Sequence, residues 1–272
     1  MKTQIEEPVQ QIEEATINKE EFVNLEKYFK KRLKKIIGFL KRDNEALVQE
    51  TIHELRVEIK KIDALFDLTK SIEKKFSRQK HFRPFLKVFK QAGKLRSIQV
   101  EFNLINSHFS ENTNSNYLHQ LHEIKHQRRI AFENILHSNL LHQLELSKKQ
   151  VIPFIRKIRR KDIVYYFNTR ERKMIKFLDK KLFKEKNLHI VRTSLKRFYL
   201  NIKNITPYKI ESGWTNIINL MGEWHDRQVA FDQLLKAIYS SKLTNHEIDR
   251  LHKVKSELLI EKDNLYEQIV AA

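Results

Sequence analysis

The sequence contains no cysteine, so disulfides, thiolate metal sites and cysteine nucleophiles are excluded. It has only 4 glycines and 4 prolines in 272 residues, which leaves little room for a glycine-rich phosphate loop. No apolar run approaches the ~18 residues that a membrane span needs. The acidic amino-terminal stretch has no apolar core, so an ordinary secretory signal or basic transit peptide is not expected. We therefore expect a soluble cytoplasmic protein.

Negative charge is also scarce, because Lys and Arg number 53 against 34 Asp and Glu, giving a formal net charge of +19. Such an excess repels itself within a compact fold and is typical of proteins whose partner is a polyanion or an anionic surface. Nucleic acid, membrane headgroups and condensed phosphates all qualify. Acidic residues gather at the start of the chain, and we expect residues 1–20 to form an acidic, disordered tail.

Apolar residues recur at spacings of three and four over long segments, which indicates an all-α protein. A break is expected near Asn168, within the helix expected at 152–184. Eight helices suggest two four-helix halves, residues 21–148 and 149–272. Breakers and polar clusters place the eight helices at 22–41, 45–69, 82–108, 114–147, 152–184, 188–205, 213–240 and 244–270.

Two motifs occur in both halves, in the same order. The histidine motif IHELRVEIKKIDAL at 52–65 aligns without gaps with LHIVRTSLKRFYLN at 188–201. Both have Arg three residues after His, followed by Lys and then a second basic residue. The glycine motif GKLRSIQVEF at 93–102 matches GEWHDRQVAF at 222–231 in its Gly, Gln, Val and Phe. The repetition predicts an internal duplication, with the histidine motif on the second helix of each half and the glycine motif on the third.

The cations of the histidine motif share one helix face. On a helical wheel His53, Arg56 and Lys60 fall within a sector of about 60°, clear of the apolar face, whereas Lys61 falls outside it. Their counterparts in the second half take the same angles. A solvated face usually mixes charges of both signs, but these stripes hold no carboxylate. Cations so close repel one another unless an anion lies among them, so we interpret each stripe as an anion-binding face.

With these doubled motifs the chain resembles the CHAD domain, the conserved histidine α-helical domain, over roughly residues 20–270. HELRVEIKK and HIVRTSLKRFY resemble its helix-two signature, and GKLRS and GEWHD resemble its glycine motif, although Ser97 stands where an aspartate is common. The resemblance implies two four-helix bundles related by a pseudo-twofold axis, which form one compact domain with a basic central groove or pore. It also implies non-catalytic binding of inorganic polyphosphate without a cofactor. The expected setting is the polyphosphate granule, with granule proteins or polyphosphate-processing enzymes as partners.

Carried over to this sequence, the resemblance implies that residues of the two histidine motifs line the groove from opposite sides. A histidine beside phosphates is expected to have a raised pKa, so binding is expected to strengthen as the pH falls through about 6 to 7. The residues implied are His53, Arg56, Lys60, Lys61, His189, Arg192, Lys196 and Arg197. Further candidates from other basic clusters and the glycine motifs are Lys31, Lys34, Lys35, Arg96, Arg128, Arg129, Lys173 and His225.

Other functions fit parts of the sequence. His225 and Asp226 are adjacent, as in metal-dependent phosphohydrolases of the HD type. The equivalent pair is Arg96 and Ser97, and no surrounding cluster of metal ligands is evident, so we expect neither a metal nor catalysis. The charge permits nonspecific nucleic-acid binding, but aromatic residues lie mainly at core spacing rather than among the cations. A membrane-surface role is disfavoured because the stripes are expected to be enclosed.

Overall fold

The computed structural model describes residues 22–41, 49–108, 115–136, 139–179, 185–207, 212–239 and 243–272. Within these ranges the chain forms nine helices and no strand, which confirms the all-α prediction. None of the described helices combines the length and apolar character that a membrane crossing requires. The expected acidic tail lies outside the described residues. The helices are α2 (Leu25–Leu40), α3 (Gln49–Ile72), α4 (Arg78–Ser107), α5 (Asn116–Leu136), α6 (Leu140–Ile155), α7 (Arg160–Asp179), α8 (Glu185–Ile205), α9 (Ser212–Ile238) and α10 (Asn245–Ala271).

Two expected helices were wrong in their extent. The segment 114–147, expected as one helix, is divided between α5 and α6, and α6 continues to Ile155. Asn139 occupies the N-cap of α6, although its side chain makes no capping hydrogen bond there. The boundary expected between residues 148 and 149 therefore falls inside a helix. Among the described residues, five helices, α2 to α6, begin in the first half rather than four, and the fifth extends into the second half.

The break expected near Asn168 was also wrong, because Asn168 lies inside α7 and the chain leaves the helix at 156–159 instead. Pro153 lies in the last turn of α6 and contributes no N–H to it. The next helix then begins where Asp162 accepts a hydrogen bond of 3.0 Å from the backbone N–H of Arg159. A carboxylate that reaches back in this way satisfies a free donor at a helix start and is favoured by the helix dipole.

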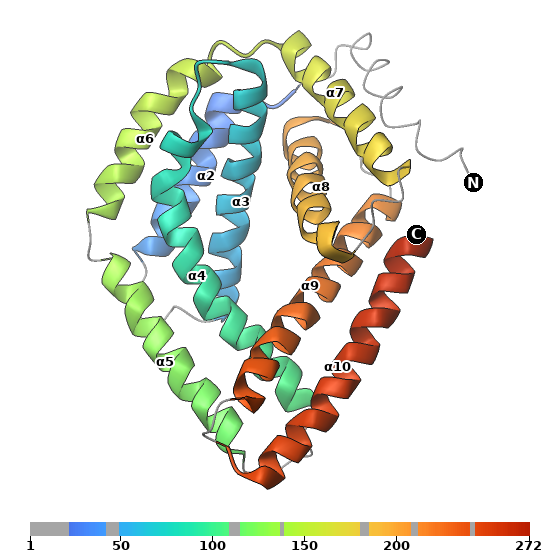
Figure 1. Ribbon diagram of the computed structural model, residues 1–272. Helices are drawn as coiled ribbons and strands as arrows, with labels where there is room; N and C mark the ends of the chain where they lie inside the picture. Colours follow the sequence, from blue (N-terminus) through green and yellow to red (C-terminus); the bar gives the residue numbers. More distant parts are fainter. Residues whose placement is uncertain are drawn as a thin grey trace.

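The largest apolar cluster joins α2, α3, α4 and α6 with parts of α5, α7 and α8. Phe66 of α3 lies at its centre, with its ring centroid 5.7 Å from Phe29, 5.3 Å from Phe76 and 5.8 Å from Phe85. A second cluster joins the end of α4 to α5, α9 and α10, which form the lower part of Figure 1. A third joins α7, α8, α9 and α10. The first two clusters draw on helices from both halves of the sequence, so the apolar packing unites the halves, whereas the third lies within the second half.

Two contacts between the halves position the repeated motifs. Helix α3 packs against α8, and α4 packs against α9, so each motif-bearing helix lies beside its counterpart. Two carboxylates of α3 reinforce this arrangement. Asp63 accepts a hydrogen bond of 2.7 Å from Nε of Arg197, and Asp67 accepts one of 2.7 Å from Arg170 of α7. In addition, the buried amide of Asn201 donates to the carbonyl of Ala64 at 2.8 Å.

Candidate functional site

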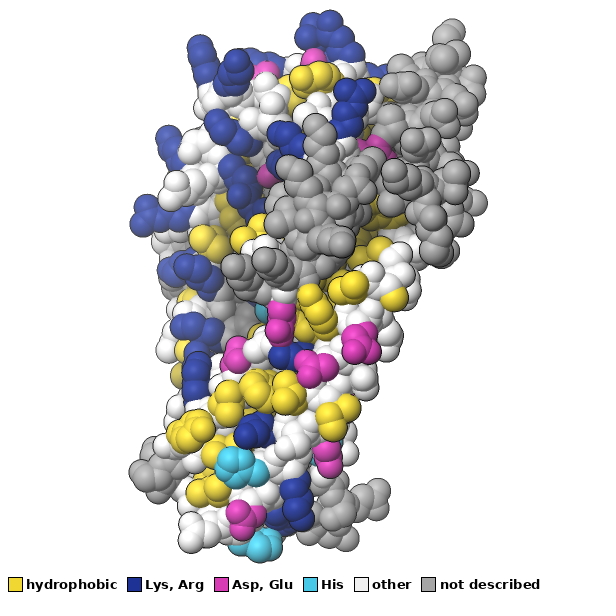
Figure 2. All heavy atoms as spheres, turned by 45° about the vertical axis from the view of Figure 1, so that its right-hand side comes forward, with side chains coloured by type: hydrophobic (Ala, Val, Ile, Leu, Met, Phe, Trp, Pro, Cys, Tyr) yellow, Lys and Arg dark blue, Asp and Glu magenta, His cyan; other side chains and the backbone are white. Residues whose placement is uncertain are grey.

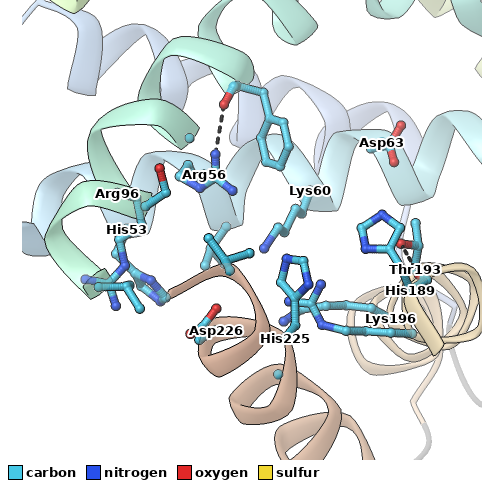
Figure 3. A pocket seen from close by; sticks show the side chains of 18 of the residues that line it. His53, Arg56, Lys60, Asp63, Arg96, His189, Thr193, Lys196, His225 and Asp226 are labelled. Atoms are coloured by element: carbon cyan, nitrogen blue, oxygen red, sulfur yellow. Dashed lines mark hydrogen bonds between the residues drawn. The ribbon is translucent and has the colours of Figure 1, made fainter. Parts of the chain in front are cut away.

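A pocket of about 440 Å³ lies among α3, α4, α8 and α9. In Figure 3 the side chains of Lys60, His225 and Asp226 point into the space between α3 and α9. The lining contains six Lys or Arg side chains and three His, but only two carboxylates. These charged or titratable residues are Arg56, Lys60, Arg96, Arg192, Lys196, Arg197, His53, His189, His225, Asp63 and Asp226.

Most of the lining comes from equivalent positions of the two sequence repeats. The histidine motifs contribute one wall each, from α3 and α8, and the glycine motifs contribute the other two, from α4 and α9. The pocket therefore lies where both copies of both motifs meet. The equivalent pairs that line it are His53 and His189, Arg56 and Arg192, Val57 and Thr193, Lys60 and Lys196, Gly93 and Gly222, Arg96 and His225, Ser97 and Asp226, and Val100 and Val229.

Of the eight residues implied for the histidine motifs, seven line this pocket and Lys61 does not. Nζ of Lys61 instead lies 2.7 Å from Glu58, a buried carboxylate that also accepts hydrogen bonds of 3.0 and 3.1 Å from Arg32. Lys61, which lies outside the narrow stripe, thus belongs to a separate ion-pair cluster with Glu58 and Arg32. Arg197 does line the pocket, but its Nε is bound to Asp63.

Among the further candidates only Arg96 and His225 line the pocket. Lys35 lies 4.0 Å from Glu58, and Arg129 pairs with Glu133 at 3.1 Å within α5. On the face drawn in Figure 2, Lys and Arg side chains are spread along one edge rather than gathered in one patch. The candidates that the structure places elsewhere are Lys31, Lys34, Lys35, Arg128, Arg129 and Lys173.

Arg56 is held tightly against α4. Its Nη1 donates a hydrogen bond of 2.8 Å to the carbonyl of Phe89, and its guanidinium carbon lies 4.2 Å from the centroid of the Phe89 ring. A Cβ at Gly93 would overlap with this guanidinium, whereas one at Gly222 would meet nothing within 4 Å. The close approach thus requires glycine in the first half only. The sequence did not identify Phe89 as part of the site, because a phenylalanine at helical spacing is indistinguishable from an ordinary core residue.

Four cations of the two stripes, Arg56, Lys60, Arg192 and Lys196, are here called the stripe cations. Burial lowers the pKa of Lys60 to about 7, and repulsion from Lys196, Arg56 and Arg192 contributes. Burial likewise lowers the pKa of Arg56 to about 10. It also lowers the pKa values of Arg192 and Lys196. Asp226 opposes each of these shifts by attraction. Protonating all four side chains is therefore costly in the protein alone.

Two histidines of the pocket, His53 and His225, show the same effect. Burial lowers the pKa of His53, with repulsion from Arg96 next in size. Burial lowers the pKa of His225 to about 4, and Arg192 and His189 add repulsion. The ring centroids of His189 and His225 lie 5.3 Å apart. The raised pKa expected for a histidine beside phosphate thus requires an anion, because His53 and His225 are shifted in the opposite direction in the protein alone.

The stripe cations have no matching carboxylates at ion-pair distance among the residues that the structure describes. The carboxylate of Asp63 is engaged by Arg197 and by Arg78. Asp226 contributes only longer-range attraction. In addition, Nε of Arg192 is buried without a hydrogen-bond partner among the described residues. A buried donor of this kind is costly.

Metal ligands do not gather in the described part of the chain, where no group of three or more His, Cys, Asp or Glu side chains could hold a metal ion. His225 and Asp226 both line the pocket from α9. Their adjacency in the sequence therefore does not extend into a larger ligand set within the described ranges.

Comparisons of this chain with protein-family models, with curated proteins and with solved structures gave no match in any of the three.

The two glycines provide a matched pair of variants. Gly222→Ala is expected to raise the free energy of unfolding by about 0.5–1 kcal/mol, because alanine loses less backbone entropy in a helix. Gly93→Ala is expected to lower it by about 1 kcal/mol, because Arg56 must leave the Phe89 carbonyl. Urea unfolding measures both effects. In an Arg56→Ala background Gly93→Ala should become stabilising, and a cycle without such coupling would contradict the steric explanation.

The pKa of Lys60 predicts how stability depends on pH. The folded-state value of about 7 lies below the ordinary value of 10.5, so between them the unfolded chain binds more protons. The free energy of unfolding should therefore rise as the pH increases from about 7 towards 10. Lys60→Met should raise stability at pH 7 and flatten this rise, whereas Lys149→Met, at an exposed site, should change neither. Parallel pH profiles for the wild type and Lys60→Met, measured by urea unfolding, would contradict the shift.

Proposed function

We propose that this protein binds inorganic polyphosphate in the pocket and catalyses no reaction on it, as the resemblance to the CHAD domain implies. The observation that carries this proposal is the convergence of the stripe cations, from equivalent positions of two repeats, on one pocket in which none of the four forms an ion pair with a described carboxylate. Such an arrangement is costly in the protein alone and becomes favourable when an anion of high charge density is present.

The chemistry of the ligand fits the chemistry of the lining. Polyphosphate carries about one negative charge per phosphoryl unit and offers no base edges, so its recognition must rest on repeated cation contacts. Arg56 and Arg192 both line the pocket, and a guanidinium can donate paired hydrogen bonds to phosphate oxygens. Lys60 and Lys196 supply compact charges that tolerate variation in where each phosphate lies.

We further propose that the two halves are related by a pseudo-twofold axis and that the pocket is the centre of a basic groove. The eight equivalent pairs in the lining support this arrangement. A linear phosphate polymer presents the same groups in either direction, so it fits a pocket whose two walls carry similar residues. The walls differ in detail, because Ser97 of the first repeat is matched by Asp226 of the second. A cytoplasmic location at polyphosphate granules, with granule proteins or polyphosphate-processing enzymes as partners, remains part of this proposal.

The alternative functions receive less support. Each phosphate of a nucleic-acid strand brings a sugar and a base, and a pocket of about 440 Å³ has no room for a succession of them. Nonspecific attraction at the basic surface is still expected in vitro. A hydrolase of the HD type would need ligands beyond His225 and Asp226, and no group of three potential ligands exists in the described ranges.

Replacing all four stripe cations by alanine tests the proposal. The quadruple variant should lose at least about 100-fold in affinity for long polyphosphate, because several charge-assisted hydrogen bonds are removed together. The matched control replaces four exposed cations outside the pocket, Lys149, Lys161, Arg172 and Lys253, and thus makes the same change in net charge. Competition titration at physiological salt, with duplex and single-stranded nucleic acid as competitors, measures both. An equal loss in the control variant, or a preference for nucleic acid, would reject specific polyphosphate binding.

Binding should also take up protons. Phosphates are expected to raise the pKa of Lys60 from about 7, and those of His53 and His225 from their lowered values. Affinity should therefore increase as the pH falls from about 9 to about 5, since each group is protonated more fully in the complex. Calorimetry at pH 7.5 in two buffers of different ionisation enthalpy measures the uptake. Lys60→Met should reduce the uptake, and proton release on binding would contradict the prediction.

A further inference from the structure

A second pocket of about 440 Å³ adjoins the first. The two share four lining residues, Lys60, Asp63, Phe89 and Arg197, so they meet along a common boundary. Asp63 follows Lys60 by three residues on α3, so the shared boundary extends over about one turn of this helix (Figure 3). The remaining lining residues of this side pocket are Ile59, Arg78, Gln79, Phe82 and Leu86.

The side pocket has a larger share of apolar side chains and fewer cations than the cationic pocket. Phe82, Leu86 and Phe89 are spaced by four and three residues along α4, so they lie on one face of this helix. Leu86 is 36% exposed, and Phe82 is 9% exposed. Ile59, which is fully buried, contributes from α3. Apolar surface thus remains open to solvent directly beside the proposed phosphate site.

Three cations line the side pocket, and two of them, Arg78 and Arg197, already bind the carboxylate of Asp63. Arg197 donates to Oδ2 of Asp63 at 2.7 Å, and Arg78 pairs with the other oxygen of the same carboxylate. A bare phosphate chain entering this space would lose its water for few new partners, which is unfavourable. An uncharged group with an apolar face would gain by covering Phe82 and Leu86. The chemistry therefore changes across the shared boundary from anion-binding to apolar.

We propose that the side pocket takes the organic end of an oligophosphate ester, of the nucleoside oligophosphate class, whose phosphates lie in the cationic pocket. The base would cover Phe82 and Leu86, and the amide of Gln79, which both donates and accepts, would reach its polar edge. The first phosphates would pass Lys60, which lines both pockets. The volume suits one nucleoside rather than a long acyl chain. This inference rests on the proposed anion site but specifies a ligand that inorganic polyphosphate does not represent.

Two ligands with the same number of phosphates test the inference. In magnesium-free buffer, calorimetric titrations compare adenosine triphosphate with linear inorganic tripolyphosphate, and long polyphosphate is titrated in parallel. The wild type should bind the nucleotide about tenfold more tightly than tripolyphosphate, since only the nucleotide buries apolar surface. Leu86→Asn should bring the two affinities within about threefold and leave long-polyphosphate binding unchanged. Leu146→Asn, at a comparably exposed leucine of α6, is the matched control and should keep the preference.

The outcomes separate this inference from the proposed function. Equal affinities in the wild type, or a nucleotide preference that survives Leu86→Asn, would overturn the inference while polyphosphate binding stands. Nucleotide binding that depends on Leu86 without any binding of long polyphosphate would support the inference and overturn the polymer as ligand. Failure of all three ligands to bind would overturn both.

Discussion

The repulsion among cations that are enclosed together is the constraint on which this structure depends. Arg56 and Lys60 of α3 face Arg192 and Lys196 of α8, and burial depresses the pKa of each. The arrangement persists because two apolar clusters that draw on helices from both halves, and a third within the second half, hold the walls in place. Hydrophobic burial over many side chains exceeds a repulsion that involves only a few. The pocket walls are thus held together by packing despite unfavourable electrostatics in the protein alone, and binding of an anion would relieve this repulsion.

Three carboxylates of α3 form ion pairs, but none of them pairs with a stripe cation. Glu58 pairs with Arg32 and Lys61, Asp63 with Arg197 and Arg78, and Asp67 with Arg170. Each of these acids stabilises packing between helices. None of them lies within the cationic stripe of the same helix. The same helix therefore uses its acidic residues to bind its neighbours, and its stripe to present positive charge.

Local patterns in the sequence were sufficient for much of the helical structure. The core face of α3, and the separation of Lys61 from Arg56 and Lys60, followed from helical periodicity alone. The breaks on either side of α6 were missed, because Asn139 and the Pro153 to Asp162 segment give weaker signals than glycine or a polar run. Phe89 and Asp63 were missed as parts of the site. Both are recognisable only from what lies beside them in space.

The sequence by itself determined that the chain is helical, that two motifs are repeated, and which side chains share a face, because these depend on the fixed geometry of one helix. Only the tertiary structure decided that both stripes line one pocket, that a side chain at Gly93 would displace Arg56 while one at Gly222 has room, and that the pKa of Lys60 falls to about 7. These properties depend on distances between helices that are remote in the sequence. Such distances follow from how many apolar side chains pack together, and no short segment specifies them.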